Sequence, residues 1–159
     1  MHASMSARRF ARPLAASSLR LALLLSALGL WPAAVPAQDI FETNADGNTI
    51  GEYTTSGATV DAALVSDLDK PYGLALSGSD LFVANYNNGT IGEYTTSGAV
   101  VNATLISRLD SPAGIAVSGG NLFVVDSGTG TVGEYDATTG AVVNATLISG
   151  CLLYTSRCV

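Results

Sequence analysis

The chain has 159 residues, of which 48% are hydrophobic and 13% are charged, and its formal net charge is −6. This acidic balance argues against a nucleic-acid-binding protein, because the chain would repel a phosphate backbone. With one histidine and two cysteines in the whole chain, there is little material for histidine-based catalysis or a thiolate metal site.

Residues 1–37 have the pattern of a secretory signal peptide. Four arginines are followed by an apolar stretch at residues 21–30 and by the small-residue cleavage motif Val35-Pro36-Ala37. Ten residues at about 1.5 Å each are too short to cross a bilayer core of about 30 Å. We therefore expect cleavage after Ala37 and export, which would place the mature chain in the periplasm, at the cell surface or outside the cell.

Removal of this leader changes the chemistry of the chain. Residues 38–159 keep thirteen acidic and three basic residues, a net charge of −10, and they lose His2 and Trp31. Binding to nucleic acid or to an anionic membrane surface is then disfavoured. No histidine is left to act as a base and no tryptophan is left to stack on a sugar.

A 41-residue segment recurs through most of the remaining chain. The sequence Ile-Gly-Glu-Tyr at residues 50–53 returns at 91–94, and Val-Gly-Glu-Tyr follows at 132–135. Self-similarity at a period of this size is typical of solenoids and propellers. The repeat therefore predicts a stack of similar supersecondary units.

Each copy consists of short apolar runs separated by turn residues. In the middle copy the runs span residues 71–76, 81–85, 90–94 and 100–107, with Gly, Asn, Asp and Ser between them. Such runs predict strands joined by tight turns, and the loops are too short for parallel crossovers. The first copy begins at Asp39 and lacks the first run. We therefore expect an all-β chain with a three-stranded unit at 39–66 and four-stranded antiparallel units at 71–107 and 112–149.

The motif Pro-x-Gly-[Leu/Ile]-Ala-[Leu/Val], followed by Asn/Asp-Leu-Phe-Val and Gly-Thr-[Ile/Val]-x-x-Tyr, resembles the NHL repeat. The resemblance covers about residues 39–150. It implies four-stranded blades of a β-propeller, usually six to a ring, of which residues 38–150 would form an incomplete arc. NHL blades often carry a basic residue where this chain has Thr49, Thr90 or Thr131, so the basic RNA- or protein-binding surfaces of some NHL proteins are not implied.

The repeat pattern stops at Gly150. The nine residues 151–159 contain both cysteines and resemble the translated read-through of a sequencing adapter. We hypothesise that they are not native and that the gene continues into further blades. The alternative is a disulfide between Cys151 and Cys158, which the six intervening residues and an oxidising compartment would permit.

One repeat position carries the candidate metal ligands. Asn44, Asn85 and Asp126 each end the second strand of a unit. Lactonases that resemble this chain bind calcium through Asn, Asp and Glu oxygens, so calcium is the one cofactor that the resemblance suggests. The alternative, which we prefer, is that each side chain accepts hydrogen bonds from backbone donors of its own turn.

Two further groups of acidic residues recur. Glu52, Glu93 and Glu134 are interpreted as solvated residues on an outer strand rather than as a cation-binding arc. Asp67, Asp69 and Asp110 lie in the connections between units, without the graded ligand spacing of a calcium loop. Neither group predicts a site.

The sequence favours a non-catalytic binding or interaction scaffold with no catalytic residue and no resident cofactor. Its partner would be a protein, a small molecule or a glycan. The alternative is part of a calcium-dependent lactonase-like or lyase-like six-bladed enzyme whose active-site residues lie mainly in blades absent from this chain. The prediction rests on the recurrence of every conspicuous polar residue, since an active site needs asymmetry.

Overall fold

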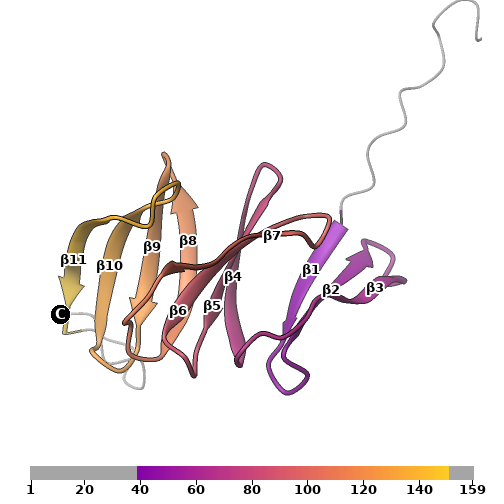
Figure 1. The fold of residues 1–159 in the computed structure, drawn as a ribbon, viewed down its shortest axis with the longest axis horizontal. Helices are drawn as coiled ribbons and strands as arrows, with labels where there is room; N and C mark the ends of the chain where they lie inside the picture. Colours follow the sequence, from indigo (N-terminus) through magenta and orange to yellow (C-terminus); the bar gives the residue numbers. More distant parts are fainter. Residues whose placement is uncertain (1–38, 151–159) are drawn as a thin grey trace, which may run out of the picture. The chain divides into compact units, whose positions relative to one another are not determined.

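A computed structural model describes residues 39–150, and these residues form eleven strands in three antiparallel sheets (Figure 1). We call each sheet a blade. The first blade contains β1 (Asp39–Asn44), β2 (Thr49–Thr54) and β3 (Thr59–Val65). The second contains β4 (Pro71–Ser77), β5 (Asp80–Asn85), β6 (Thr90–Thr95) and β7 (Val100–Ile106). The third contains β8 (Pro112–Ser118), β9 (Asn121–Asp126), β10 (Thr131–Asp136) and β11 (Val142–Ser149).

The prediction of an all-β chain with antiparallel blades is confirmed. Every blade is a meander in which sequential strands pair, and the register repeats, with Asn44 opposite Thr49 and Asn85 opposite Thr90. The predicted leader at residues 1–37 and the tail at 151–159 lie outside the described residues. In the described part there is no helix long and apolar enough to cross a membrane.

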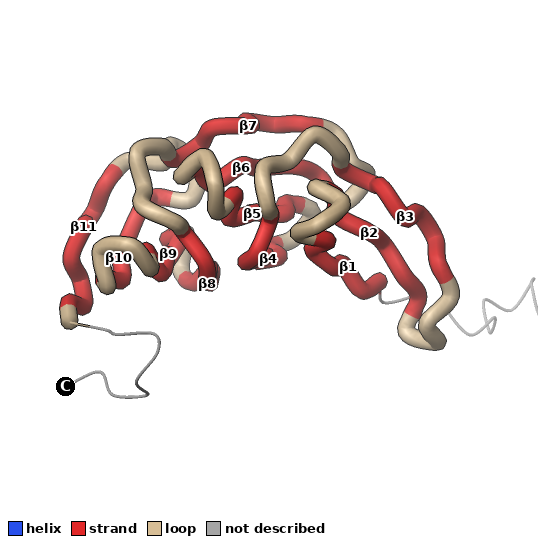
Figure 2. Tube along the Cα trace, turned by 90° about the horizontal axis from the view of Figure 1, so that it is seen from below, coloured by secondary structure: helices blue, strands red, loops and turns tan. Residues whose placement is uncertain are grey.

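The blades lie side by side, with β4 and β8 on the inner side and the last strand of each blade on the outer side (Figure 2). Because side chains alternate along a strand, each blade has two faces. On β5, Leu81 and Val83 point toward the preceding blade, whereas Phe82 and Ala84 point toward the next one. We call these the leading face and the trailing face.

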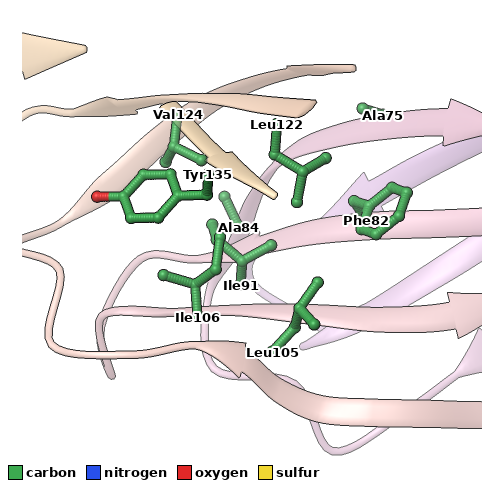
Figure 3. Packing of buried hydrophobic residues seen from close by; sticks show 9 residues of the cluster. All are labelled: Ala75, Phe82, Ala84, Ile91, Leu105, Ile106, Leu122, Val124 and Tyr135. Carbon is green, nitrogen blue, oxygen red and sulfur yellow. The ribbon is translucent and has the colours of Figure 1, made fainter. Parts of the chain in front are cut away.

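Two apolar clusters hold the three blades together. Between the first and second blades, Ile50 and Val65 pack against Leu81, Val83 and Tyr94. Between the second and third blades, a larger cluster joins the two sheets (Figure 3). Its members are Ala75, Phe82, Ala84, Ile91, Leu105 and Ile106 from the second blade and Leu122, Val124 and Tyr135 from the third. Most of the apolar core therefore lies between blades, as expected for a repeat fold.

The connections between blades are hydrogen-bonded to the turns on both sides of them. In the connection 107–111, Leu109 N donates to the Gly89 carbonyl of the second blade, and the Asp110 carbonyl accepts from Gly128 N of the third. In the connection 66–70, Leu68 N donates to Asn48 O, and Lys70 O accepts from Tyr86 N. We call this end of the blades the linker end. Its connections are part of the packed structure rather than free loops.

Candidate functional site

Asn44, Asn85 and Asp126 all lie at the linker end, but their surroundings differ. Asn44 is exposed, and its Oδ1 accepts a hydrogen bond from Gly47 N at 2.9 Å. Asp126 is 7% exposed, and its oxygens accept from Asp110 N at 2.9 Å and from Thr129 N at 3.4 Å. Asn44 therefore accepts from its own turn, whereas Asp126 accepts both from its own turn and from the connection that precedes its blade.

Asn85 is the exception. Its side chain is 3% exposed, and Nδ2 donates to Thr90 Oγ1 at 3.3 Å, but Oδ1 has no hydrogen-bond partner within residues 39–150. The Tyr94 ring lies over Gly92 two residues earlier on the same strand. Burial raises the pKa of the Tyr94 hydroxyl, and a hydrogen bond with Asn85 partly offsets that rise. Asn85 therefore offers one buried amide oxygen.

One free amide oxygen does not fit a calcium ion, which takes six to eight oxygen ligands. In residues 39–150 no three His, Cys, Asp or Glu side chains come together as a metal site would require. The assignment of Asn44, Asn85 and Asp126 to a metal stays a prediction, and we derive no chemistry from it.

The recurring glutamates are less solvated than the sequence suggested. Each lies opposite a phenylalanine of the preceding strand and is half-buried; the three are Glu52 on β2, Glu93 on β6 and Glu134 on β10. Burial raises the pKa of Glu93, and the charge of Asp80 raises it further. In the third blade, asparagine replaces this aspartate, and Asn121 Nδ2 donates to Glu134 Oε1 at 2.7 Å. The same position therefore carries a repulsive pair in one blade and a hydrogen bond in the next.

We expect Asp80→Asn to raise the free energy of unfolding by about 1 kcal/mol at pH 7, since it allows the hydrogen bond seen in the third blade. The raised pKa of Glu93 means that its protonated form is favoured on folding, so its contribution to stability is lost as pH rises through the folded-state pKa. The gain from Asp80→Asn should accordingly shrink toward pH 4. Urea unfolding at pH 7 and at pH 4 measures this change in the free energy of unfolding. The control is Asn121→Asp, which should lower the free energy of unfolding at pH 7.

A second group of polar residues at the linker end occurs in one blade alone. Lys70 Nζ lies 5.7 Å from the ring centre of Tyr72 and 5.6 Å from that of Tyr86. The two rings meet edge to face with their centres 4.7 Å apart. Tyr72 is 44% exposed, although it lies on the inner strand β4. We call these three residues the Lys70 cluster.

The third blade has no counterpart of the Lys70 cluster. Ser111, Ala113 and Ser127 stand at the equivalent positions. The signal for this cluster in the sequence is a difference between copies of the repeat rather than a recurrence. All three residues differ from their counterparts in the next copy, so a comparison of the two copies identifies them.

A separate hollow of about 420 Å³ lies between β1 and the second blade. It is lined by Asp39, Ile40, Phe41, Thr55, Leu76 and Thr96. Asp39 begins β1, so the hollow is at the end of the blades away from Asn44 and the linker end. It contains none of the predicted site residues.

Neither a family model nor a curated protein matches this chain, so the NHL resemblance stays a prediction at the level of the family. Solved structures do match. A streptogramin B lyase is 22% identical with a TM-score of 0.59, over 73% of this chain and 39% of that one. A virginiamycin B lyase from Staphylococcus aureus is 24% identical with a TM-score of 0.57, over 70% and 39%. A chain of a nidogen/laminin complex is 19% identical with a TM-score of 0.58, over 68% and 41%.

These matches concern the fold. The chain spans about two fifths of the length of each solved structure, and all three identities are below 25%. They include both enzymes and a protein complex, so the likeness does not separate catalysis from binding. Residues 39–150 have the blade architecture of a β-propeller.

Proposed function

We propose that this protein is an exported, non-catalytic binding module that holds its ligand at the linker end of the second blade. The observation that carries the proposal is the Lys70 cluster, since it breaks the repeat at an exposed inner position. A binding site needs residues that differ from blade to blade. The recurring polar residues Asn44 and Asp126 are instead engaged by backbone donors.

The cluster suits a small ligand that combines a flat apolar face with one carboxylate. The partly exposed Tyr72 ring offers an apolar surface with a polar edge. Lys70 and Arg108 are the only basic residues among residues 39–150, within a strongly acidic chain. A polyanion would be repelled by the rest of the surface, whereas a single carboxylate could pair with Lys70 at short range. Oligosaccharides with one uronic acid belong to this class.

The third blade supplies the substitutions that test the site. Lys70→Ser and Tyr72→Ala copy Ser111 and Ala113, and Lys70 and Ser111 share a left-handed backbone with φ of 57° and 60°. Both variants should therefore fold. We expect Tyr72→Ala to weaken binding of a glucuronic-acid-containing trisaccharide about tenfold, because part of the contact surface is lost.

Calorimetry with this trisaccharide and with a neutral trisaccharide of equal length measures the effect. Lys70→Ser should remove the preference for the acidic sugar and leave the weak affinity for the neutral one. Val143→Ala, on the outer strand β11, is the control and should bind as the unchanged chain does. Equal affinities of all variants for both sugars would overturn the proposal.

The alternative is part of a calcium-dependent lactonase-like or lyase-like enzyme whose active-site residues lie mainly in further blades, and two of the similar structures are lyases. The export component rests on the leader pattern of residues 1–37. Fusion of those residues to a reporter enzyme that is active only outside the cytoplasm tests it.

A further inference from the structure

The outer strand of the second blade, β7, is an edge strand without charge. It ends the sheet order β4-β5-β6-β7 and lies on the outer side of the blades (Figure 2). Its sequence Val-Val-Asn-Ala-Thr-Leu-Ile contains no charged residue, and Val100 and Val101 are 62% and 53% exposed. Folded proteins often protect such an edge with charged side chains or prolines, because its unpaired backbone groups can pair with another chain. Strand β7 has neither.

The pairing of β7 with β6 is irregular around Asn102. Asn102 lies opposite Glu93, and the register shifts on both sides of this pair. Asn102 Oδ1 accepts a hydrogen bond from Thr104 N at 3.1 Å, so residues 102–104 form a local turn inside the strand. All three of these residues are exposed. This part of the strand is therefore accessible from outside, although it belongs to a sheet.

The first blade shows which part of this pattern the fold requires. Asp61 occupies the repeat position of Asn102, and its Oδ1 accepts a hydrogen bond from Ala63 N at 2.9 Å. The same turn therefore forms without a hydroxyl at its third residue. The edge of β3 carries the charge of Asp61, whereas β7 carries Asn-Ala-Thr at the same place. The turn alone does not account for the threonine at position 104.

Asn-Ala-Thr is an acceptor sequence for an N-linked glycan. We propose that Asn102 is a glycan acceptor in the exported chain, and that its glycan protects the edge of β7 as Asp61 protects that of β3. The inference rests on export, which is part of the proposed function, and not on the Lys70 cluster.

The donor in this reaction is an oligosaccharide carried on a polyprenyl pyrophosphate. A bond forms between Asn102 Nδ2 and the anomeric carbon of the oligosaccharide. The bond from that carbon to the pyrophosphate breaks, the pyrophosphate leaves with the electron pair, and Nδ2 loses one proton. The hydrogen bond from Thr104 N uses Oδ1 and not the nitrogen that reacts.

The third blade repeats the arrangement. Asn144 lies opposite Glu134 at a shift in register, and its Oδ1 accepts a hydrogen bond from Thr146 N at 3.1 Å. Strand β11 also contains no charged residue. Asn102 is exposed although another blade follows it, so exposure at this repeat position does not depend on which blade comes last. We expect Asn144 to be a second acceptor.

A third Asn-x-Thr sequence, at residues 88–90, has different surroundings. It spans the turn between β5 and β6, and Thr90 is 7% exposed. Thr90 Oγ1 donates to Asn88 Oδ1 at 2.7 Å and accepts from Asn85 Nδ2 at 3.3 Å. Because the acceptor sequence requires the hydroxyl of its third residue, we expect Asn88 to stay unmodified in the folded chain.

Glycan transfer to the folded, unglycosylated chain tests the proposal. The chain is incubated with a single-subunit oligosaccharyltransferase and its lipid-linked donor. Enzymatic release of the glycans in heavy-oxygen water then marks each modified asparagine for peptide mass spectrometry. We expect the mark on Asn102 and Asn144 and not on Asn88. Thr104→Ala copies Ala63 of the first blade, so it should fold, lose the mark on Asn102 and keep that on Asn144.

Secretion from yeast separates the glycan site from export. One strain produces the chain with its own residues 1–37, and a second produces it with a yeast leader in their place. A glycan on Asn102 with the yeast leader alone would contradict export and support the site. The proposal is overturned if Asn102 stays unmodified both with the yeast leader and in the folded chain, or if Asn88 is modified in the folded chain as fully as Asn102.

The protective role of the glycan has its own measurement. Asn102→Asp gives β7 the charge that Asp61 gives β3. Sedimentation velocity over a range of concentrations should show that the unglycosylated chain associates, whereas the glycosylated chain and unglycosylated Asn102→Asp associate less. Thermal melts establish that each protein is folded. Equal association of all three proteins would overturn the protective role.

Discussion

Gly89→Ala is expected to lower the free energy of unfolding by about 3 kcal/mol or more. Gly89 has a φ of +67°, and a Cβ there would run into the carbonyl oxygen of Leu109 in the next connection. The turn cannot move away freely, because Gly89 N donates to Asn85 O and Gly89 O accepts from Leu109 N. The substitution therefore combines backbone strain with a clash between a blade and its linker.

Gly78→Ala separates these two effects within the same blade. Gly78 has a φ of +61°, and a Cβ there would meet nothing within 4 Å. We expect a loss of about 1 kcal/mol from backbone strain alone. Urea unfolding of both variants measures the difference. Equal losses would mean that the connection 107–111 does not pack against Gly89.

Asp126→Ala is expected to cost about 2–4 kcal/mol, because it leaves the backbone donors of Asp110 and Thr129 without their acceptors. The carboxylate accepts from both and joins the third blade to the connection ahead of it. Asn44→Ala removes one exposed turn hydrogen bond and should cost about 0.5–1 kcal/mol. The two substitutions are at the same repeat position. The difference between their effects on the free energy of unfolding therefore measures how the burial and hydrogen bonding of that position differ between blades.

The effect of calcium on the melting temperature distinguishes a structural role of Asp126 in its turn from a role as a metal ligand. If Asp126 stabilises its turn, millimolar calcium should leave the melting temperature of the unchanged chain where it was, and chelation should do the same. A rise in melting temperature with calcium that disappears in Asp126→Ala would support the metal interpretation instead.

The strands could be predicted from the sequence because their causes are local. Alternating apolar residues, and turns such as Asn87-Asn88-Gly89, specify strand and turn without reference to the rest of the chain. The start of the first unit at Asp39 also follows from comparing copies, and β1–β2–β3 form a three-stranded sheet.

The roles of the recurring polar residues could not be predicted, because they depend on contacts between distant segments. Asn85 and Asp126 share a repeat position, yet Asp126 accepts a hydrogen bond from the connection before its blade and Asn85 Oδ1 has no partner within residues 39–150. Glu93 and Glu134 differ because Asp80 faces one and Asn121 the other.

The most direct test of the ligand site is a residue-resolved NMR titration of the chain with the glucuronic-acid-containing trisaccharide. We expect chemical-shift changes in the amides of residues 69–73 and 85–88, which surround the Lys70 cluster, and none in the equivalent residues 110–114 and 126–129 of the third blade. Because the two blades share one backbone pattern, the third blade serves as an internal control. Equal changes in both blades, or changes confined to residues outside the cluster, would contradict a site built from the residues that break the repeat.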